Sequence, residues 1–293
     1  MSSFLVIETV SEKFEEFIDY KKSMGVCDAT LTTYRNHFKA INIAEGDIDG
    51  VNWENVIQSV GERQIADYSK ISYLKSLKAF MNWLGIKPLP RIPKIETVKE
   101  TYTDEELRKL IVKPKRATFA ELRTWALIQL TLDTGLRASS LRNIQIKDIA
   151  DNSVIIRHNK TRKVQYLPFS QTTQNSLNTF LRYRGTAGSE YLFCDACGNQ
   201  LTANGLKLSV KRYNEKRGIH KTSLHMFRHT FAKKWLLDCN GNAFTLQKML
   251  GHSTMEMTRH YTNIWDADLA NSYVSPLEKL QRKQIKVEHS LHH

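Results

Sequence analysis

Residues 250–261 read LGHSTMEMTRHY, and the interpretation of the whole chain starts from this stretch. Ser253 and Glu256 form an S-x-x-E capping box, the pattern that begins a helix. Gly251 is the residue type that ends a helix, and the apolar segment 244–250 before it has helical composition. The stretch therefore predicts one helix that ends at Gly251, a short turn, and a second helix that begins near Ser253.

Two side chains of this stretch can carry chemistry. His252 lies in the predicted turn, and Tyr261 follows nine residues later on the second helix. In one interpretation the turn fixes the imidazole and the helix presents the phenol to a reaction. In the other, the stretch is an ordinary joint between two helices and the tyrosine packs in the core. The stretch alone leaves both interpretations open.

The composition is that of a globular protein with one large domain or two ordinary ones. The chain has 293 residues, of which 41% are hydrophobic and 25% charged. No apolar run reaches the roughly eighteen residues of a membrane span. Residues 1–10 lack the basic start and the small-residue cleavage site of a signal peptide. Four cysteines in a chain of this length do not make a disulfide framework, so we expect a cytoplasmic protein.

The charge of the chain predicts a polyanionic partner. The net charge is +13 and the pI about 9.5. Residues 1–98 hold 12 Lys+Arg and 13 Asp+Glu, whereas residues 99–293 hold 31 and 17, so the excess lies in the second part. Within the first part, residues 68–95 hold six basic residues and no acid. Nucleic acid is the first candidate partner, and a merely basic globular protein is the alternative.

Residues 1–86 are predicted to form a helical domain. Apolar side chains recur at helical spacing in four segments, at 14–24, 30–41, 53–60 and 68–84. The last segment carries three lysines on its other face: Lys70, Lys75 and Lys78. These lysines form either a solvated face or a set of contacts to phosphates.

Residues 87–99 are predicted to form a basic, proline-rich linker. Three of the six prolines fall within 88–93, and proline fixes φ and removes an amide donor, so an extended connection is expected. Its basic residues Lys87 and Arg91 are candidates for contacts with a nucleic-acid backbone.

Residues 100–275 are predicted to form a second, mostly helical domain. Segment 118–133 is apolar on most faces, as in a buried helix. Gly135 suits the left-handed position at its end, so Arg137 projects from a tight turn beside the core. Further helices are predicted at 173–183, 207–216 and 224–239, and a last amphipathic segment at 276–287 within the tail 276–293.

The only strand-like composition lies between these helices. Segments 154–156 and 164–167 are rich in β-branched residues and flank a basic tip at 158–163. This pattern predicts an antiparallel hairpin beside a third short strand at 144–149. The fold class is therefore mainly α, with a small antiparallel three-stranded sheet in the second domain.

A zinc site is a rival interpretation of part of this region. Cys194 and Cys197 are followed by His225 and His229, but the gap between the pairs is 27 residues, against roughly 12–15 in a zinc finger. The histidines also lie in a cationic run, which disfavours another cation. A turn between elements is the preferred interpretation of the cysteine pair, and no metal and no cofactor are expected. No phosphate-binding glycine loop occurs in the sequence.

Five motifs in order resemble one family, the tyrosine recombinases (the phage-integrase and Xer family). They are Thr134-Gly135-Leu136-Arg137, Asn159-Lys160-Thr161, the nine residues LHMFRHTFA at 224–232, Leu250-Gly251-His252 and Tyr261-Thr262. The resemblance covers the second domain, and the helical first domain is similar to the core-binding domain of the family. One departure is Ser140, where the family often has an acid three residues after the first arginine. The implied fold of the second domain is that of the DNA breaking-rejoining enzymes.

The resemblance implies which residues carry the chemistry. Six residues would surround a scissile phosphate: Tyr261, Arg137, Lys160, His225, Arg228 and His252. Tyr261 would be the nucleophile of a covalent 3′-phosphotyrosyl link, with His225 as its base and Lys160 as general acid. An aryl phosphate ester can be attacked by a 5′-hydroxyl in reverse, so no ATP is needed. Arginine forks suit the oxygens of the transition state, so no metal is required.

The resemblance also implies the partners. These are double-stranded DNA with core recombination sites, a homo-tetramer on paired sites, and accessory DNA-bending or directionality factors. Residues expected to contact DNA are Lys70, Lys75, Lys78, Lys87, Arg91, Arg162, Lys163, Lys211 and Arg212. The tail would dock on a neighbouring protomer or pack on its own domain. Because the first domain begins almost at Met1, no additional arm-site domain is expected.

The predicted function is therefore a site-specific DNA recombinase of the nucleoid. Integration or transposition of a mobile element is the first candidate role, and Xer-like resolution of chromosome or plasmid dimers is the second. Two further alternatives are a non-catalytic DNA-binding protein and a type IB topoisomerase-like enzyme. Tetramer-dependent strand exchange separates the last of these from recombination.

Overall fold

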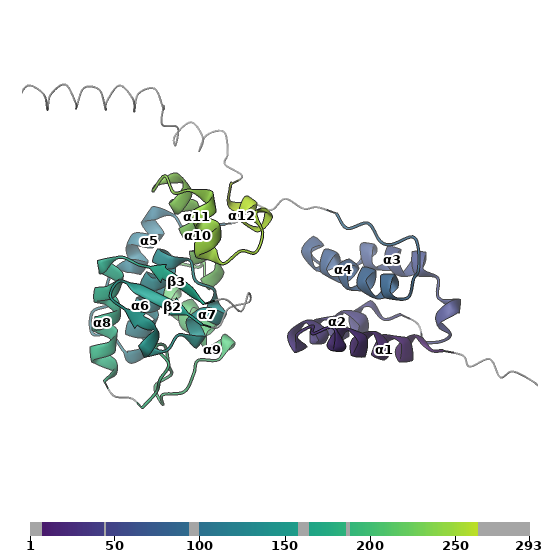
Figure 1. The fold of residues 1–293 in the computed structure, drawn as a ribbon, viewed down its shortest axis with the longest axis horizontal. Helices are drawn as coiled ribbons and strands as arrows, with labels where there is room; N and C mark the ends of the chain where they lie inside the picture. The colour runs from purple at the N-terminus through teal and green to yellow at the C-terminus, as the bar shows by residue number, and fades with distance from the viewer. Residues whose placement is uncertain (1–7, 44, 94–99, 158–163, 186–187, 263–293) are drawn as a thin grey trace, which may run out of the picture. The chain divides into compact units, whose positions relative to one another are not determined.

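The computed structural model of the protein describes residues 8–43, 45–93, 100–157, 164–185 and 188–262, with 259–262 by backbone only. The chain divides into two compact units, Met1–Thr97 and Val98–His293. Figure 1 shows the helices and strands within each unit. None of the helices in the described ranges combines the length and the apolar character that a membrane crossing needs.

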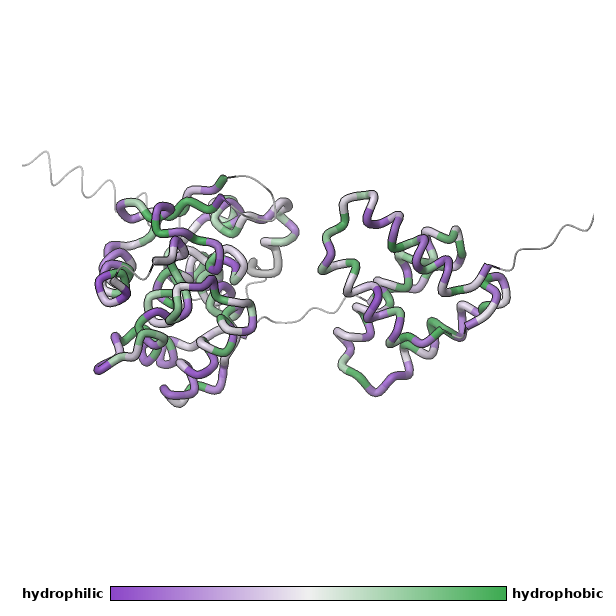
Figure 2. The backbone as a smooth tube through the Cα atoms, turned by 90° about the horizontal axis from the view of Figure 1, so that it is seen from below, coloured by the Kyte–Doolittle hydropathy of each residue, from purple (hydrophilic) through white to green (hydrophobic). Residues whose placement is uncertain are grey.

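The first unit is helical, as its periodicity predicts. It contains α1 (Val10–Ser23), α2 (Asp28–Ile41), α3 (Trp53–Glu62) and α4 (Asp67–Trp83). Aromatic rings fill one side of its core: Phe14 stacks on Phe38 with ring centroids 3.7 Å apart and meets Phe80 edge-on at 5.5 Å. Figure 2 shows green apolar and purple polar residues alternating along these helices, so each helix has a face to bury.

The first part of the proline-rich stretch lies against this unit. Ile86, Leu89 and Ile92 pack on the cluster formed by Val60 of α3 and its neighbours in α4. In the division of the chain into two compact units, residues up to Thr97 go with the first. Packing of these apolar side chains is favourable because burying them removes apolar surface from water.

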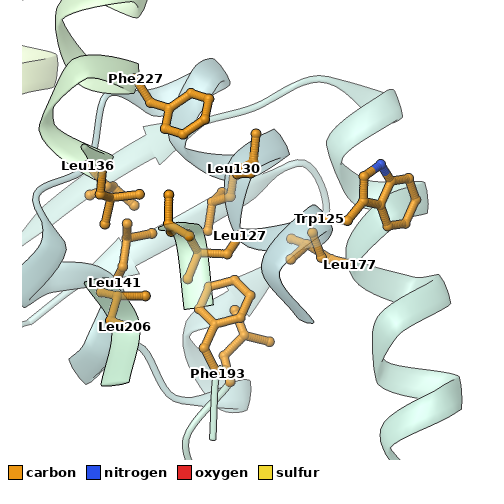
Figure 3. Close-up of a cluster of buried hydrophobic side chains, with 14 of the residues drawn as sticks. Trp125, Leu127, Leu130, Leu136, Leu141, Leu177, Phe193, Leu206 and Phe227 are labelled. Carbon is orange, nitrogen blue, oxygen red and sulfur yellow. The ribbon is translucent and has the colours of Figure 1, made fainter. Parts of the chain in front are cut away.

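The second unit is built around α6 (Phe119–Thr134). This helix packs against α5 (Asp104–Ile111), α8 (Gln171–Arg184), α9 (Ala203–Glu215) and α10 (Leu224–Leu237). Its side chains are buried on most faces, as predicted for a helix that is apolar all round. Figure 3 shows Leu127 and Leu130 of α6 among Leu136, Leu141, Phe193 and Phe227 from other elements.

A small sheet lies beside this helical core. β1 (Ile149–Ala150), β2 (Ser153–Ile156) and β3 (Gln165–Pro168) pair antiparallel in the order β1-β2-β3. Val154, Ile156 and Leu167 face the core and are buried. The predicted three-stranded antiparallel sheet is therefore confirmed, but its third strand, predicted at 144–149, is only β1, because Ile146–Asp148 forms a 3-10 helix. The basic tip predicted at 158–163 lies outside the described residues.

The entry into the second unit is fixed on α10. The Tyr102 ring stacks on Phe227 at 4.2 Å, and its backbone N–H donates to the Thr230 hydroxyl at 2.9 Å. The Tyr102 hydroxyl accepts from the Asn214 amide at 2.9 Å. Burial raises the pKa of Tyr102 well above its ordinary value, so this phenol stays neutral and keeps its hydrogen bonds. The contacts hold the helix that carries His225 and Arg228.

The opening stretch forms the end of α11 (Ala243–Leu250) and the start of α12 (Met255–Thr262). Gly251 ends α11 in the left-handed conformation, with φ 60°, as predicted. The second helix starts at Met255, one residue later than the predicted capping box would start it. The reason is that His252 still belongs to the end of α11, since its N–H donates to Gln247 O at 3.1 Å. The Ser253 hydroxyl lies 3.5 Å from the Met257 sulfur.

Candidate active site

Arg137 projects from the turn that ends α6. Gly135 closes that helix with φ 64°, and Arg137 then precedes α7 (Ala138–Asn143) in extended conformation. Its guanidinium reaches the start of the 250–261 stretch, where Nη1 and Nη2 donate to Gly251 O at 3.4 and 3.5 Å. The prediction that Gly135 ends the helix ahead of a projecting arginine is confirmed.

Arg228 connects the turn at Gly135 with the turn at Gly251 through hydrogen bonds from its side chain. Its side chain is buried, at 2% exposure, and Nη1 donates to Gly135 O at 2.7 Å. Nη2 donates to Leu250 O at 2.8 Å. A buried guanidinium is costly unless its donors are satisfied, and here the backbone of both turns satisfies them. The C-terminal end of α11 also carries partial negative charge, which favours a cation at this place.

His252 lies at the same turn, and its hydrogen bonds define its tautomer. Arg228 Nη2 lies 2.9 Å from His252 Nε2. A guanidinium only donates, so Nε2 is the acceptor. In the neutral ring the hydrogen is then on Nδ1, which donates to the Thr258 hydroxyl at 2.9 Å. Thr258 is fully buried on α12 and ties the histidine to the helix whose backbone carries Tyr261.

His225 and His229 stand one turn apart on α10. Their ring centroids lie 4.4 Å apart at an interplanar angle of 72°. His225 is exposed and lies three residues before Arg228 on the helix, whereas His229 is buried. The sequence gives no partner for His229, because nothing local indicates that its ring lies beneath another imidazole.

Gln165, the first residue of β3, was missed by the sequence analysis. Its Nε2 donates to Lys248 O and, at 2.9 Å, to Met249 O, the last carbonyls of α11 before Leu250. A polar residue at the start of a strand carries no local signal of such a long-range bond. The Gln165 amide thus contacts the end of α11, next to the turn that contains His252 and that Arg137 and Arg228 contact.

The structure thus brings three of the predicted catalytic residues to one turn. Arg137 contacts Gly251 of this turn, and Arg228 contacts Leu250 and His252. His225 lies three residues before Arg228 on α10. For Tyr261 the structure describes only its backbone position in α12. Lys160, Arg162 and Lys163 lie outside the described residues, and so does the tail 276–293.

The predicted DNA-contacting residues that the structure describes lie on two units. Lys70, Lys75 and Lys78 belong to α4, and the exposed Lys87 and Arg91 follow it. Lys70 lies 4.0 Å from Asp67 in the preceding turn. In the second unit, Lys211 and Arg212 are exposed on α9, where Lys211 lies 3.7 Å from Glu215.

The cysteine pair forms a turn, as preferred from the sequence. The backbones of Cys194 and Gln200 pair in an isolated antiparallel β-bridge. The Asp195 carboxylate accepts from the backbone N–H groups of Cys197 and Asn199 at 2.9 and 2.8 Å. Cys194 is buried and Cys197 exposed. Among the described residues, no group of three or more His, Cys, Asp and Glu side chains is arranged to hold a metal ion.

The two guanidiniums and the imidazole at this helix end are side chains of the kind that bind phosphate groups. The family model described as "Phage integrase family" matches residues 100–267, more than half of the chain. The chain therefore belongs to this family, the tyrosine recombinases, and is a DNA strand-transferring enzyme.

Relatives and solved structures agree with this assignment. The chain is 30% identical to tyrosine recombinase XerA of Saccharolobus solfataricus over 214 residues, which cover 72% of this chain and 68% of the relative. It is 24% identical to tyrosine recombinase XerC of Lacticaseibacillus casei over 291 residues, 89% of this chain and 96% of the relative.

Two solved structures show the same fold. One is the XerH site-specific recombinase bound to a palindromic difH substrate, with TM-score 0.69, 20% identity, and coverage of 88% of this chain and 82% of that chain. The other is a lambda integrase tetramer bound to a Holliday junction, with TM-score 0.67, 16% identity, and coverage of 89% and 80%.

Proposed function

We propose that the enzyme cleaves and rejoins DNA through a covalent 3′-phosphotyrosyl intermediate in which Tyr261 is the nucleophile. The observation that carries the proposal is the convergence of Arg137, Arg228 and His252 on the turn at 250–252. Tyr261 follows on the helix that His252 contacts through Thr258. A free phenol has a pKa of about 10 and is a poor nucleophile near neutral pH, so it needs such a cationic neighbourhood.

The proposed step balances as follows. The Tyr261 oxygen forms a bond to phosphorus while the bond from phosphorus to the 5′ oxygen breaks. His225, exposed on α10, takes the phenol proton, and Lys160 gives a proton to the departing 5′ oxygen. Attack by a 5′-hydroxyl of another strand reverses these transfers and restores the phosphodiester. The backbone-bond energy is therefore kept in the aryl ester.

The two arginines stabilise the charge that builds up in this step. The transition state carries negative charge on its non-bridging oxygens, and the planar guanidinium forks supply N–H donors for that charge. His252 is proposed to donate to the same phosphate. Since its Nε2 accepts from Arg228 in the structure, this requires a proton on Nε2 and a shift of the Arg228 donor toward the phosphate.

The remaining basic residues are proposed as contacts to the DNA backbone. They are Lys70, Lys75, Lys78, Lys87, Arg91, Arg162, Lys163, Lys211 and Arg212. Phosphate contacts position a protein on DNA without reading its sequence. A homo-tetramer on two paired core sites is proposed for strand exchange, and the lambda integrase tetramer on a Holliday junction supports such an assembly by analogy.

Two biological roles fit the reaction. Integration or transposition of a mobile element is the first candidate from the sequence. Resolution of chromosome or plasmid dimers is the second, and the Xer names of the relatives favour it. The two roles are distinguished by giving the enzyme two substrates, a plasmid with two directly repeated sites and a pair of plasmids with one site each. Dimer resolution predicts deletion between the repeats, whereas integration predicts joining of the pair.

The decisive test is the covalent adduct. The full-length protein is incubated with a pool of nicked suicide duplexes that carry randomised core sequences, and SDS-resistant adducts are recovered and sequenced. We expect an adduct from the wild type and none from Tyr261→Phe, with a chelator making no difference. An adduct formed by Tyr261→Phe would refute the assignment of the nucleophile. Loss of the adduct with the chelator would refute the metal-free step.

A further inference from the structure

The end of α11 has an unusual set of partners. A helix leaves its last four carbonyls without partners in the helix itself, and they must be satisfied from outside. At this end, side chains from three other elements supply donors. Gln165 of β3 donates to Lys248 O and Met249 O, Arg228 of α10 to Leu250 O, and Arg137 to Gly251 O.

Four consecutive carbonyls therefore accept hydrogen bonds from three side chains. Two of these side chains are the proposed phosphate ligands, and their contacts with the turn fix where their guanidiniums stand. The third side chain, Gln165, is neutral, and it donates to the two carbonyls that precede those bound by the arginines. Lys248 O also accepts from the Gly251 N–H, so the Gln165 amide adds to the backbone bonds that close the helix and is the side-chain donor to Met249 O.

Gly251 shows how closely these groups approach. A Cβ added there would lie 3.2 Å from Gln165 Oε1 and 3.5 Å from Arg137 Nη1. The Gln165 amide and the Arg137 guanidinium thus both lie against the same glycine backbone. Both side chains therefore depend on where the Gly251 backbone lies.

Gln165 also connects the turn to the sheet. It pairs with Ile156 of β2 in the antiparallel register. On the other edge of that register, Arg157 Nε donates to the buried Asp148 carboxylate at 2.7 Å. Side-chain hydrogen bonds therefore hold both chain ends that flank residues 158–163, and those from Gln165 reach the last turn of α11, just before the 250–252 turn.

We propose that Gln165 is a positioning residue of the active site: its amide holds the end of α11 on β3 and thereby sets Arg137, Arg228 and His252 for the phosphate. The proposal rests on the function proposed above. Gln165 itself touches no reacting atom. Its role needs an amide, because two N–H donors on one neutral group match two adjacent carbonyls, whereas a carboxylate of the same shape offers none.

The test compares two Gln165 variants with a matched control. Gln165→Met keeps the approximate volume and removes both donors, and Gln165→Glu keeps the shape and removes them too. The control is Gln129→Met, because Gln129 Nε2 also donates to the carbonyl of a helix end, Ile111 O at 2.9 Å, away from the candidate site. All three variants are made in the full chain, and their thermal unfolding is recorded.

The first readout is single-turnover adduct formation on the suicide duplex that the wild type selects. We expect the rate at saturating protein to fall about tenfold or more in both Gln165 variants, since small misplacements of catalytic groups have large effects on rate. The half-saturating protein concentration should stay within about twofold, because phosphate contacts elsewhere dominate binding. Gln129→Met should match the wild type in both quantities. Wild-type rates in both Gln165 variants would overturn the proposal, as would a change in DNA affinity alone.

The second readout needs no DNA. The backbone amides of Gly251 and His252 donate to Lys248 O and Gln247 O, so their hydrogen exchange reports the order of the turn. We expect faster exchange at these amides in Gln165→Met and unchanged exchange in Gln129→Met. Unchanged exchange in Gln165→Met would overturn the proposal even if no adduct forms. A wild type that forms no adduct, with faster exchange in Gln165→Met, would instead count against the proposed reaction alone.

Discussion

Arg228 is the residue on which most of the candidate site depends. Its guanidinium is buried, and it bonds the carbonyls of Gly135 and Leu250 as well as the His252 ring. Few side chains can do this, because the three acceptors lie in different directions and only a planar fork with several donors reaches them together. Charge alone is therefore insufficient at this position.

The substitution Arg228→Lys tests this statement. It keeps the positive charge and removes the fork, so we expect adduct formation to slow by about 10²- to 10³-fold, the range seen when one preorganised donor is lost. Single-turnover cleavage of a suicide duplex measures the change. Thermal unfolding of the same protein serves as the control for folding. A rate within a few-fold of wild type would show that the fork geometry is dispensable.

Gly135 gives a prediction about stability. A Cβ at this position would lie 2.8 Å from Leu250 Cδ2 and would also clash with the Phe231 ring, and the backbone has φ +64°. Overpacking and the left-handed strain together should make Gly135→Ala about 2–4 kcal/mol less stable, measured by urea unfolding. Gly218→Ala is the control, since Gly218 also follows a helix end with positive φ (+69°) and has nothing within 4 Å of an added Cβ. Equal losses in both variants would show that packing around Gly135 contributes nothing.

The sequence shows some of these residues and hides others. Gly135 and Gly251 are predictable because each follows an apolar helical segment, and a left-handed helix end is a local property. Arg137, Arg228 and His252 are recognised through motifs of the family. Gln165 is not, because its partners lie more than 80 positions away and are backbone carbonyls, which leave no mark in the sequence.

At the scale of elements, the start of α6 is held by charge. The Glu121 carboxylate closes a capping box with Thr118 and accepts from Lys216, at the end of α9, at 2.5 Å. The Lys216 hydrogen bond, followed by that of the Thr118 N–H, holds the pKa of Glu121 below its ordinary value of 4.5. A carboxyl whose folded pKa is lowered stabilises the fold while it is ionised.

The lowered pKa of Glu121 determines how its contribution to the stability of the fold depends on pH. The contribution of Glu121 is complete above about pH 4.5 and is lost as the pH falls through the lower folded pKa. Glu121→Gln should therefore be about 0.5–1 kcal/mol less stable than wild type near neutral pH, and the difference should shrink toward about pH 3. Urea unfolding at a series of pH values measures it, with the exposed Glu105→Gln as the control. A difference that grows on acidification would contradict the prediction.

Secondary structure was largely predictable, and the exceptions have physical causes. The short strands are recognised because β-branched residues bracket a basic tip, and the helices because apolar residues recur at helical spacing. The start of α12 is shifted from the Ser253 capping box because His252 completes the end of α11 first. The proline-rich stretch packs on the first unit through Ile86, Leu89 and Ile92, an apolar pattern that the prolines obscure.

At the scale of the whole molecule, the uneven charge is the property that matters for DNA. The net charge is +13, and all of the excess lies beyond residue 98. Binding to duplex DNA should therefore weaken steeply with salt, because each neutralised phosphate releases counterions. The lysines of α4 are the contacts proposed for the first unit, although that unit is nearly neutral overall.

Salt titration of DNA binding tests the proposed contact at Lys75, an exposed lysine of α4. We expect Lys75→Gln to lower the magnitude of the slope of log affinity against log salt by about 1, as for the loss of one phosphate contact. Fluorescence anisotropy with a labelled duplex provides the affinities. Lys109→Gln is the control, because Lys109 pairs with Glu105 at 3.1 Å and is not among the proposed contacts. An unchanged slope in Lys75→Gln would remove Lys75 from the contact set.

The way the end of α11 is held has a consequence for how this enzyme can change over generations. The backbone carbonyls at the end of α11 accept hydrogen bonds from Gln165, Arg137 and Arg228. A backbone carbonyl is the same whatever side chain its residue bears. The side chains at outward-facing positions of α11, such as the exposed Phe244, Thr245 and Lys248, can therefore be substituted while the turn keeps its position. A library randomised at these three codons should retain many active members, which makes this helix a suitable region for selecting recombinases with altered surfaces.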